Sequence, residues 1–255
     1  MHATLSAEAR LAALRDEVRR IHAARRPAGC GVLPFGIEAV DTRLADGGLA
    51  LAALHEAAAA RPTLGDDCAA TLFLAASAAR LSRLQGRGQV LWAFIRRDLF
   101  APGLACAGLN PERLLYAECR DDAECLAVME EGLRHGGLAA VVGEVSRLAM
   151  AAARRLQLAA EEGGTIALLL RRWRKAGADP LAAPSSAVTR WRIGCAPSAP
   201  LPFAGGIGRG RWQVALERQR GGPPHQWLLE MPDAEARLAL PARSGDRPDQ
   251  AARAA

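Results

Sequence analysis

The sequence predicts an α/β fold, with a mostly parallel sheet covered by helices on both faces and antiparallel strands near its C-terminal end. Three observations predict this class. Apolar runs of strand length alternate with helical segments between residues 49 and 171. After Gly177 the apolar runs become short and partly alternating, and Gly- and Pro-rich turns separate them. The length of 255 residues and the 50% content of hydrophobic residues suit one large globular domain.

The first expected element is an amphipathic helix over residues 5–25, followed by a break at Pro27 and Gly29. Ser6 is a suitable N-cap. Apolar side chains recur at helical spacing at Leu11, Leu14, Val18 and Ile21. A stripe this narrow either folds back on the protein's own core or docks on another protein. We therefore expect residues 1–27 to form a helix and linker, with these four residues as candidates for partner docking.

The main body is expected over residues 28–240. Strands are predicted at residues 49–57, 88–95, 113–119, 138–145 and 164–171, with helices between them at residues 67–84, 121–137 and 148–162. Three further strands are predicted to form an antiparallel meander at the sheet edge, at residues 187–196, 210–220 and 225–231. Residues 241–255 are polar and rich in Pro and Ala, and we expect them to be disordered.

The loop after the first of these strands keeps the spacing of a phosphate-binding loop, G-x-x-x-x-G-K-[ST]. Ala60 and Gly65 stand at the two glycine positions, but Asp66 and Asp67 replace the lysine and the hydroxyl residue. The one lysine of the chain, Lys175, is far away in the sequence. Two carboxylates suit the positive end of a helix dipole, and they would repel a triphosphate. The sequence therefore predicts a degenerate nucleotide site and no cofactor.

Basic residues gather in one window of the chain. Between residues 171 and 220, ten basic residues face only two acidic ones, Asp179 and Glu217. The candidates for DNA contact are Arg171, Arg172, Arg174, Lys175, Arg209, Arg211, Arg218 and Arg220. Three tryptophans are interleaved with them, Trp173, Trp191 and Trp212, and cations with aromatic side chains suit a single strand. Alternatively, the tryptophans pack in the core and the arginines only solvate a face, because 32 of the 33 basic residues are arginine.

Other classes of protein find little support. The six cysteines form no C-x-x-C pair and the five histidines are scattered, so we expect neither a metal site nor a hydrolytic triad. No apolar run approaches ~18 residues, so no transmembrane helix is expected. The N-terminal residues mix acids and bases without a separate apolar segment, which argues against a signal peptide. We expect a cytoplasmic protein.

The order of these segments resembles that of RecA-type recombinases from about Val32 to Met231. Residues 33–57, LPFGIEAVDTRLADGGLALAALHEA, look like the entry segment of that fold. Residues 89–98, QVLWAFIRRD, look like its next core strand, and residues 138–148, LAAVVGEVSRL, like its Walker B strand. Within this superfamily the closing segment RWQVALERQRGGPPHQWLLEM is similar to that of the ImuA-type inducible mutagenesis proteins, also described as SulA-like.

The resemblance implies roles for three further residues. Asp98 falls where a recombinase carries its water-activating carboxylate, and Gly143 falls where the Walker B aspartate should be, with Glu144 one place on. Without that aspartate, Mg²⁺ loses its usual anchor. The alternative is that the acids converge at the strand ends and hold a metal, since α/β sheets bind ligands there. The resemblance also implies that the loops near residue 171 face DNA.

The resemblance implies a non-catalytic adaptor of SOS-induced mutagenic translesion synthesis. Its partners would be an ImuB-type protein that works with an error-prone DnaE-type polymerase, and RecA as a further partner. The main alternative is a module that binds single-stranded DNA directly or modulates RecA. A SulA-like inhibitor of cell division rests on analogy of fold alone, and an unusual ATPase would need the acids to act without a lysine.

Overall fold

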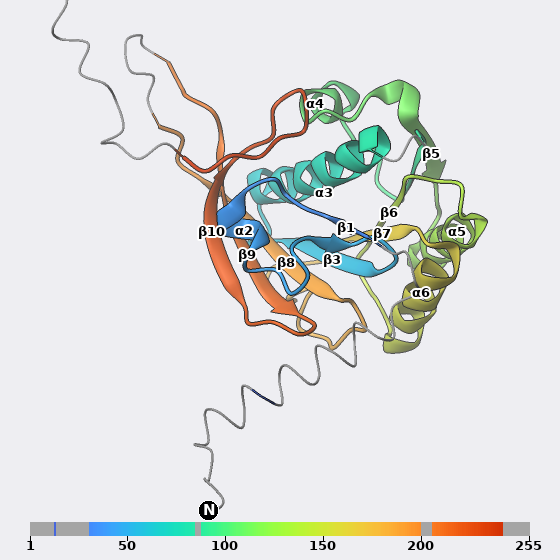
Figure 1. Ribbon diagram of the computed structural model, residues 1–255. Helices are drawn as coiled ribbons and strands as arrows, with labels where there is room; N and C mark the ends of the chain where they lie inside the picture. The colour runs from blue at the N-terminus through green and yellow to red at the C-terminus, as the bar shows by residue number, and fades with distance from the viewer. Residues whose placement is uncertain (1–12, 14–30, 85–87, 200–205, 242–255) are drawn as a thin grey trace, which may run out of the picture.

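The computed structural model describes Ala13 and residues 31–84, 88–199 and 206–241 (Figure 1). The predicted N-terminal helix, including Leu11, Leu14, Val18 and Ile21, lies outside the described residues except for Ala13. The predicted disordered tail lies outside them from residue 242 onward. Of the helices in the described ranges, none is long and apolar enough to cross a membrane.

An eight-stranded sheet forms the centre of the described chain, in the order β10-β9-β8-β3-β7-β6-β4-β5. Its six neighbouring parallel strands are β3 (Leu54–Ala59), β4 (Val90–Phe94), β5 (Leu114–Glu118), β6 (Ala140–Val145), β7 (Ile166–Arg171) and β8 (Thr189–Ala196). Two antiparallel strands extend it, β9 (Arg211–Gln219) and β10 (His225–Glu230). This topology confirms the predicted mostly parallel sheet with antiparallel C-terminal strands.

The strand predicted over residues 49–57 is divided in two. Its first part is β2 (Leu49–Ala50), which pairs with β1 (Val32–Leu33) in a separate antiparallel ribbon; its second part is β3. The short helix α2 (Glu38–Asp41) lies between β1 and β2. A Cβ on Gly48 would come within 2.5 Å of the Leu33 carbonyl oxygen, so the glycine allows the ribbon to close.

Helices cover both faces of the sheet. α3 (Leu64–Leu84) packs on one face, and α5 (Asp122–His135) and α6 (Met150–Gly163) pack on the other (Figure 1). α5 has the expected caps, because Asp121 accepts a 2.9 Å hydrogen bond from the Glu124 amide and Gly136 adopts φ 68°. The connection between β4 and β5 contains α4 (Ala101–Cys106) and a 3-10 turn, Pro111–Arg113, where the sequence predicted only a loop.

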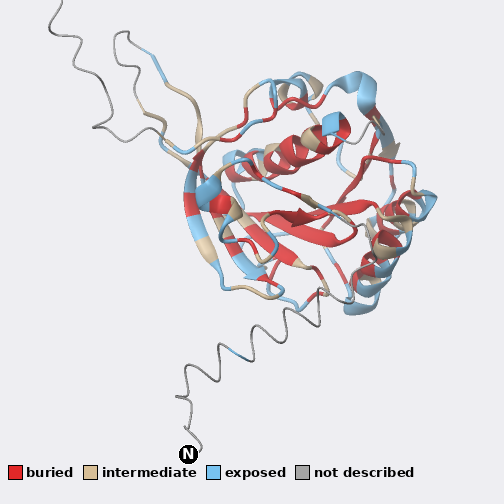
Figure 2. Cartoon of the chain, in the orientation of Figure 1, coloured by how far each residue is buried: buried red, intermediate tan, exposed pale blue. Residues whose placement is uncertain are grey.

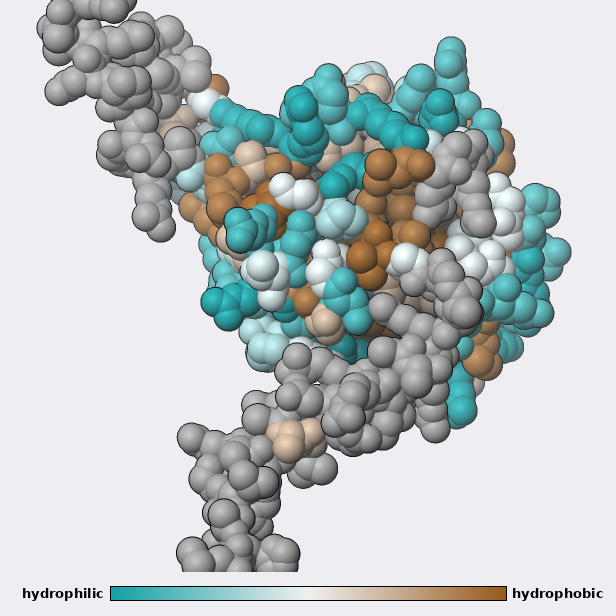
Figure 3. All heavy atoms as spheres, viewed as in Figure 1, coloured by the Kyte–Doolittle hydropathy of each residue, from teal (hydrophilic) through white to brown (hydrophobic). Residues whose placement is uncertain are grey.

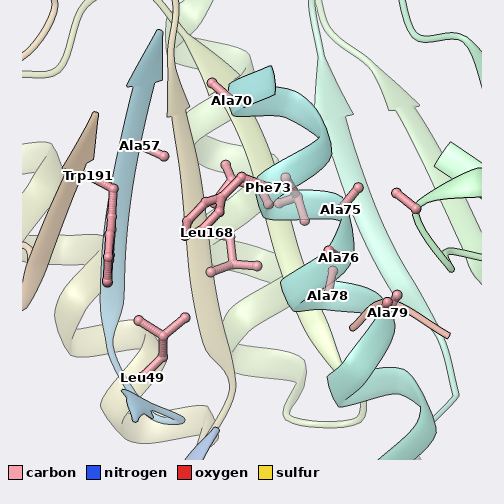
Figure 4. Close-up of a cluster of buried hydrophobic side chains, with 14 of the residues drawn as sticks. Leu49, Ala57, Ala70, Phe73, Ala75, Ala76, Ala78, Ala79, Leu168 and Trp191 are labelled. Carbon is pink, nitrogen blue, oxygen red and sulfur yellow. The ribbon is translucent and has the colours of Figure 1, made fainter. Parts of the chain in front are cut away.

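The core on the α3 side is built from small residues and a few rings. Six buried alanines of α3 allow the helix to lie close to the strands: Ala69, Ala70, Ala75, Ala76, Ala78 and Ala79. Phe73 projects from α3 toward Leu168 of β7 (Figure 4). Its ring centroid lies 5.5 Å from that of Trp191 on β8. This packing supports the prediction of a buried small-residue helix.

Burial follows the layers of the fold. The strands and the inner side of α3 are buried, whereas the outer turns of α5 and α6 are exposed (Figure 2). On the face seen in Figure 3, hydrophobic residues gather near the middle and hydrophilic residues surround them. The loops at the carboxyl ends of the parallel strands carry five of the sequence-predicted site residues, Ala60, Asp98, Arg172, Arg174 and Lys175.

Candidate functional site

The chain forms the predicted strand–loop–helix at the degenerate phosphate-binding loop. β3 ends at Ala59, the loop follows, and α3 begins at Leu64. The loop is tied to the neighbouring strand, because the Ala60 amide donates a 2.7 Å hydrogen bond to the Ile193 carbonyl. An amide with this partner is not available to cradle a phosphate oxygen.

Asp66 is turned toward β8, away from the loop's opening. Its buried carboxylate accepts a 2.8 Å hydrogen bond from the Cys195 amide and another of 2.8 Å from Arg61 Nε. Burial acts to raise the pKa of Asp66, but these hydrogen bonds outweigh it and hold the pKa below its ordinary value. Asp66 therefore connects the N-terminal end of α3 to β8.

Three of the predicted acids converge on one cation, Arg172, which follows β7. Its guanidinium donates to Glu144 at 2.7 and 2.9 Å, to Asp98 at 3.3 Å and, in a short hydrogen bond, to Asp67. The Arg172 side chain is only 6% exposed. We call these four residues the Arg172 cluster. A predicted DNA-binding arginine and three residues of the predicted nucleotide site thus form one network.

The carboxylates around Arg172 keep its guanidinium charged. Burial lowers the pKa of Arg172, but Glu144, Asp67 and Asp98 together raise it above its ordinary value, so the guanidinium stays protonated. Burial raises the pKa of Glu144, against the opposing effects of Arg172 and of Trp92, whose indole N–H donates a 2.7 Å hydrogen bond to the carboxylate. A buried arginine with several carboxylate partners is the arrangement that makes buried charge tolerable.

Gly143 and Glu144 face opposite sides of β6. Side chains alternate along a strand, and position 143 faces α5, where a Cβ would overlap the Met129 sulfur. Position 144 faces the N-terminal end of α3 through its contacts with Arg172 and Trp92. Glu144, not Gly143, therefore occupies the place on β6 from which a carboxylate reaches the loop. The packing of Met129 explains why position 143 has no side chain.

A surface pocket of about 390 Å³ opens in front of the α3 N-terminus, beside the Arg172 cluster. We call it the mouth pocket. It is lined by Pro62, Thr63, Leu64, Asp67, Arg96, Trp173, Arg174, Lys175 and Ala176. Arg96 forms a 2.6 Å ion pair with Asp98 at its edge. Asp67 connects the pocket to the Arg172 cluster.

A second charged network lies on the opposite face of the sheet. Glu56 of β3 is fully buried and pairs with Arg171 at 3.2 Å, with Arg190 at 3.4 Å and with the Ser185 hydroxyl. We call it the Glu56 cluster. Burial lowers the pKa of Arg171 against the pull of Glu56. Sequence reasoning missed Glu56, although a charged residue inside the apolar run LAALHEAAAA was a usable signal.

Most of the other predicted DNA-contact residues are engaged with the protein. Arg218 and Arg220 donate to the carbonyls of Ser185 and Ser186, and thereby hold the loop before β8. Arg209 and Arg211 each lie 3.9 Å from Glu230. Arg171 and Arg172 are buried in the two clusters. In this set, the exposed cations whose side chains form neither a hydrogen bond nor an ion pair with a described residue are Arg174 and Lys175.

Two of the interleaved tryptophans are core residues, as the alternative reading of the sequence anticipated. Trp191 is 1% exposed and Trp212 is 3% exposed, so neither offers a ring face to a nucleic acid base. Trp173 is partly buried, and its indole N–H donates a 2.9 Å hydrogen bond to the Ala59 carbonyl. In the described part of the chain, no group of three or more His, Cys, Asp or Glu residues is arranged to hold a metal ion.

Comparison with known proteins places this geometry in a family. No protein-family model matches the chain. The chain is 39% identical over 207 residues to Protein ImuA from each of two strains of Caulobacter vibrioides, and the match covers 80% of this chain and 84% of each relative. Identity at this level over most of both chains shows common family membership. The chain belongs to the ImuA family of inducible mutagenesis proteins.

Proposed function

We propose that this chain is a non-catalytic adaptor in SOS-induced mutagenic translesion synthesis. It would support an ImuB-type protein and an error-prone DnaE-type polymerase, with RecA as a further partner. Family membership supports the link to the mutagenesis system. The absence of catalysis and the adaptor role rest on the site.

The observation that carries the proposal is the position of Arg172. In a working phosphate-binding loop, a lysine and a Mg²⁺ ion neutralise the phosphates, and carboxylates at the strand ends hold the metal and the attacking water. Here the guanidinium of Arg172 joins Asp67, Asp98 and Glu144, so a cation of the chain itself satisfies the acids. We interpret the site as a former nucleotide site, in a RecA-like fold, that no longer binds nucleotide.

Two further contacts support this interpretation. The Ala60 amide is bonded to Ile193, and Asp66 is bonded to Arg61 and the Cys195 amide. The Ala60 amide, which could otherwise bind a phosphate oxygen, and the Asp66 carboxylate, which stands at the lysine position, therefore both have structural roles. The sheet is then a rigid scaffold, and its outer surfaces are the places where partners bind.

A binding assay with a fluorescent ATP analogue tests the loss of nucleotide binding. We expect no saturable binding below millimolar concentrations for the full chain, with or without Mg²⁺. A micromolar dissociation constant that is lost in Asp67→Ala would overturn the proposal. Co-purification with the ImuB-type partner, with and without residues 1–27, tests the adaptor role and the predicted docking helix. If neither form retains the partner, the chain is not its adaptor.

Direct binding of single-stranded DNA is the second candidate function. The exposed cations Arg174 and Lys175 favour it, because no described residue pairs with them. It would give an affinity that falls steeply with salt. Fluorescence anisotropy with a labelled oligonucleotide at low and moderate salt measures it. If alanine at both positions leaves the affinity unchanged, these cations are not the binding site.

A further inference from the structure

The mouth pocket combines a small excess of positive charge with an apolar rim. Around it stand four cations, Arg96, Arg172, Arg174 and Lys175, and three carboxylates, Asp67, Asp98 and Glu144. One net positive charge remains. Arg96 and Arg172 already form ion pairs with these carboxylates. The excess positive charge is therefore carried by the exposed side chains of Arg174 and Lys175.

Few other free cations lie near this pair at the strand ends. Three arginines there have carboxylate partners of their own, Arg61 with Asp66 at 2.8 Å, Arg97 with Glu118 at 2.8 Å and Arg120 with Glu124 at 2.9 Å, whereas Arg147, after β6, is exposed and forms no ion pair with a described residue. Tight binding of a nucleic acid strand draws on cations that neutralise several successive phosphates. A local excess of one charge instead suits a single anionic group, such as a carboxylate side chain.

The rim of the pocket is suited to an apolar group beside that anion. Leu64, at the start of α3, is 78% exposed on one wall, next to Pro62. Trp173 also lines the pocket, and its hydrogen bond to the Ala59 carbonyl holds the ring in place before any ligand arrives. Preorganised Trp and Arg side chains around a pocket are typical of protein–protein hot spots. A phosphodiester backbone would leave Leu64 without an apolar contact.

We propose that the mouth pocket binds an acidic–apolar peptide segment of a partner protein. A carboxylate of the peptide lies between Arg174 and Lys175, and the neighbouring apolar side chain packs on Leu64 and Trp173. The volume of about 390 Å³ falls in the range of ~300–1,000 Å³ that ligand pockets occupy. The inference rests on the adaptor function proposed above and assigns that function a surface.

A displayed library of random twelve-residue peptides, selected on the full chain and counter-selected on Arg174→Glu/Lys175→Glu, tests the class of ligand. We expect the enriched peptides to share Asp or Glu next to Leu, Phe or Met. Enrichment of basic or wholly apolar peptides, or no enrichment that depends on the two cations, would overturn the proposal. Both residues are exposed, so the variant should keep the thermal unfolding midpoint of the parent chain.

Fluorescence polarisation then measures the affinity of one enriched peptide. We expect Arg174→Glu/Lys175→Glu to weaken binding at least ~tenfold, since the reversed charges repel the peptide carboxylate. Leu64→Ser should weaken it roughly tenfold through loss of apolar burial. The matched control Arg147→Glu/Arg154→Glu changes the net charge equally on exposed residues around the start of α6, and it should leave binding unchanged.

A labelled dT20 oligonucleotide tests whether the pocket binds the phosphates of a nucleic acid instead of a peptide carboxylate. If dT20 binds, loses affinity in Arg174→Glu/Lys175→Glu and competes with no peptide, the pocket is a nucleic acid site and the proposal fails. Failure of the adaptor function is a separate result, because it appears as loss of the ImuB-type partner from the chain both with and without residues 1–27. If the peptide binds but the ImuB-type protein does not co-purify, the pocket is a peptide-binding site and the ImuB-type protein is not its partner.

Discussion

Arg171 and Arg172 are neighbours in the sequence, and they enter two different charged networks on opposite faces of the sheet. The Arg172 cluster has three carboxylates around one guanidinium and opens toward the mouth pocket. The Glu56 cluster has one carboxylate between two guanidinium groups and is closed. The difference shows that the alternation of a strand end, not the local sequence composition, decides the environment of a charge.

The two clusters also differ in how completely their polar atoms are satisfied. In the Glu56 cluster, Arg171 Nε and Arg190 Nε are buried and have no hydrogen-bond partner. In the Arg172 cluster, Arg172 Nε donates to Glu144 at 2.9 Å. We therefore expect the Glu56 cluster to be the more fragile of the two, because removing its one carboxylate leaves two buried cations without compensation.

Glu56→Gln gives the largest expected loss of stability. The change keeps the size of the side chain but removes the negative charge shared by Arg171 and Arg190. Breaking a buried pair in this way costs about 3–5 kcal/mol of unfolding free energy, measured by urea denaturation. The control Glu118→Gln removes an exposed partner and should cost about 0–1 kcal/mol. Equal effects of the two variants would contradict the proposed importance of the Glu56 cluster.

Arg172→Met tests the other cluster and should have a smaller effect, about 2–4 kcal/mol at pH 7. Asp67 and Asp98 are 17% and 34% exposed and can be hydrated, whereas buried Glu144 must take up a proton. A folded-state carboxyl pKa above the unfolded value gives stability that is lost as the pH rises through it. Urea denaturation at pH 5 and pH 8 should find the variant more stable at pH 5; a flat response would reject this explanation.

Gly143→Ala tests whether position 143 of β6 faces Met129 of α5, on the side of the strand away from the Arg172 cluster. The added methyl group would overlap Met129 of α5, and overpacking of this kind costs about 1–3 kcal/mol. Thermal unfolding of Gly143→Ala, Met129→Ala and the double variant separates the two effects. The double variant should lose less than the sum of the single changes, because the smaller side chain makes room. Strict additivity would mean that position 143 does not face Met129.

Asp66→Asn gives the smallest expected effect, about 1–2 kcal/mol at pH 7, through weaker hydrogen bonds with Arg61 and the Cys195 amide. The pKa of Asp66 is lowered in the folded chain. Its contribution is therefore complete above the ordinary aspartate pKa and is lost as the pH falls through the lowered value. The difference between parent and variant should shrink in acid. A difference that grows in acid would contradict the role given to Asp66.

The sequence by itself determined the class of the fold and the order of its main strands. These follow from local patterns: apolar runs with a strand's length and caps such as Asp121 and Gly136. The absence of a lysine near Gly65 predicts the loss of phosphate-binding chemistry. The division of residues 49–57 into β2 and β3 escaped prediction, because residues 49–54, which include the break, are all Leu or Ala and carry no turn signal.

Only the tertiary structure decided what the charged residues do. The sequence placed Arg171 and Arg172 in one basic window, and the fold buries them on opposite faces beside Glu56 and Glu144. It also directed the Glu144 carboxylate toward Arg172 and left Arg174 and Lys175 exposed. The physical reason is that these ion pairs join residues 28 to 115 positions apart, and the partner of a charge depends on strand order and on side-chain alternation.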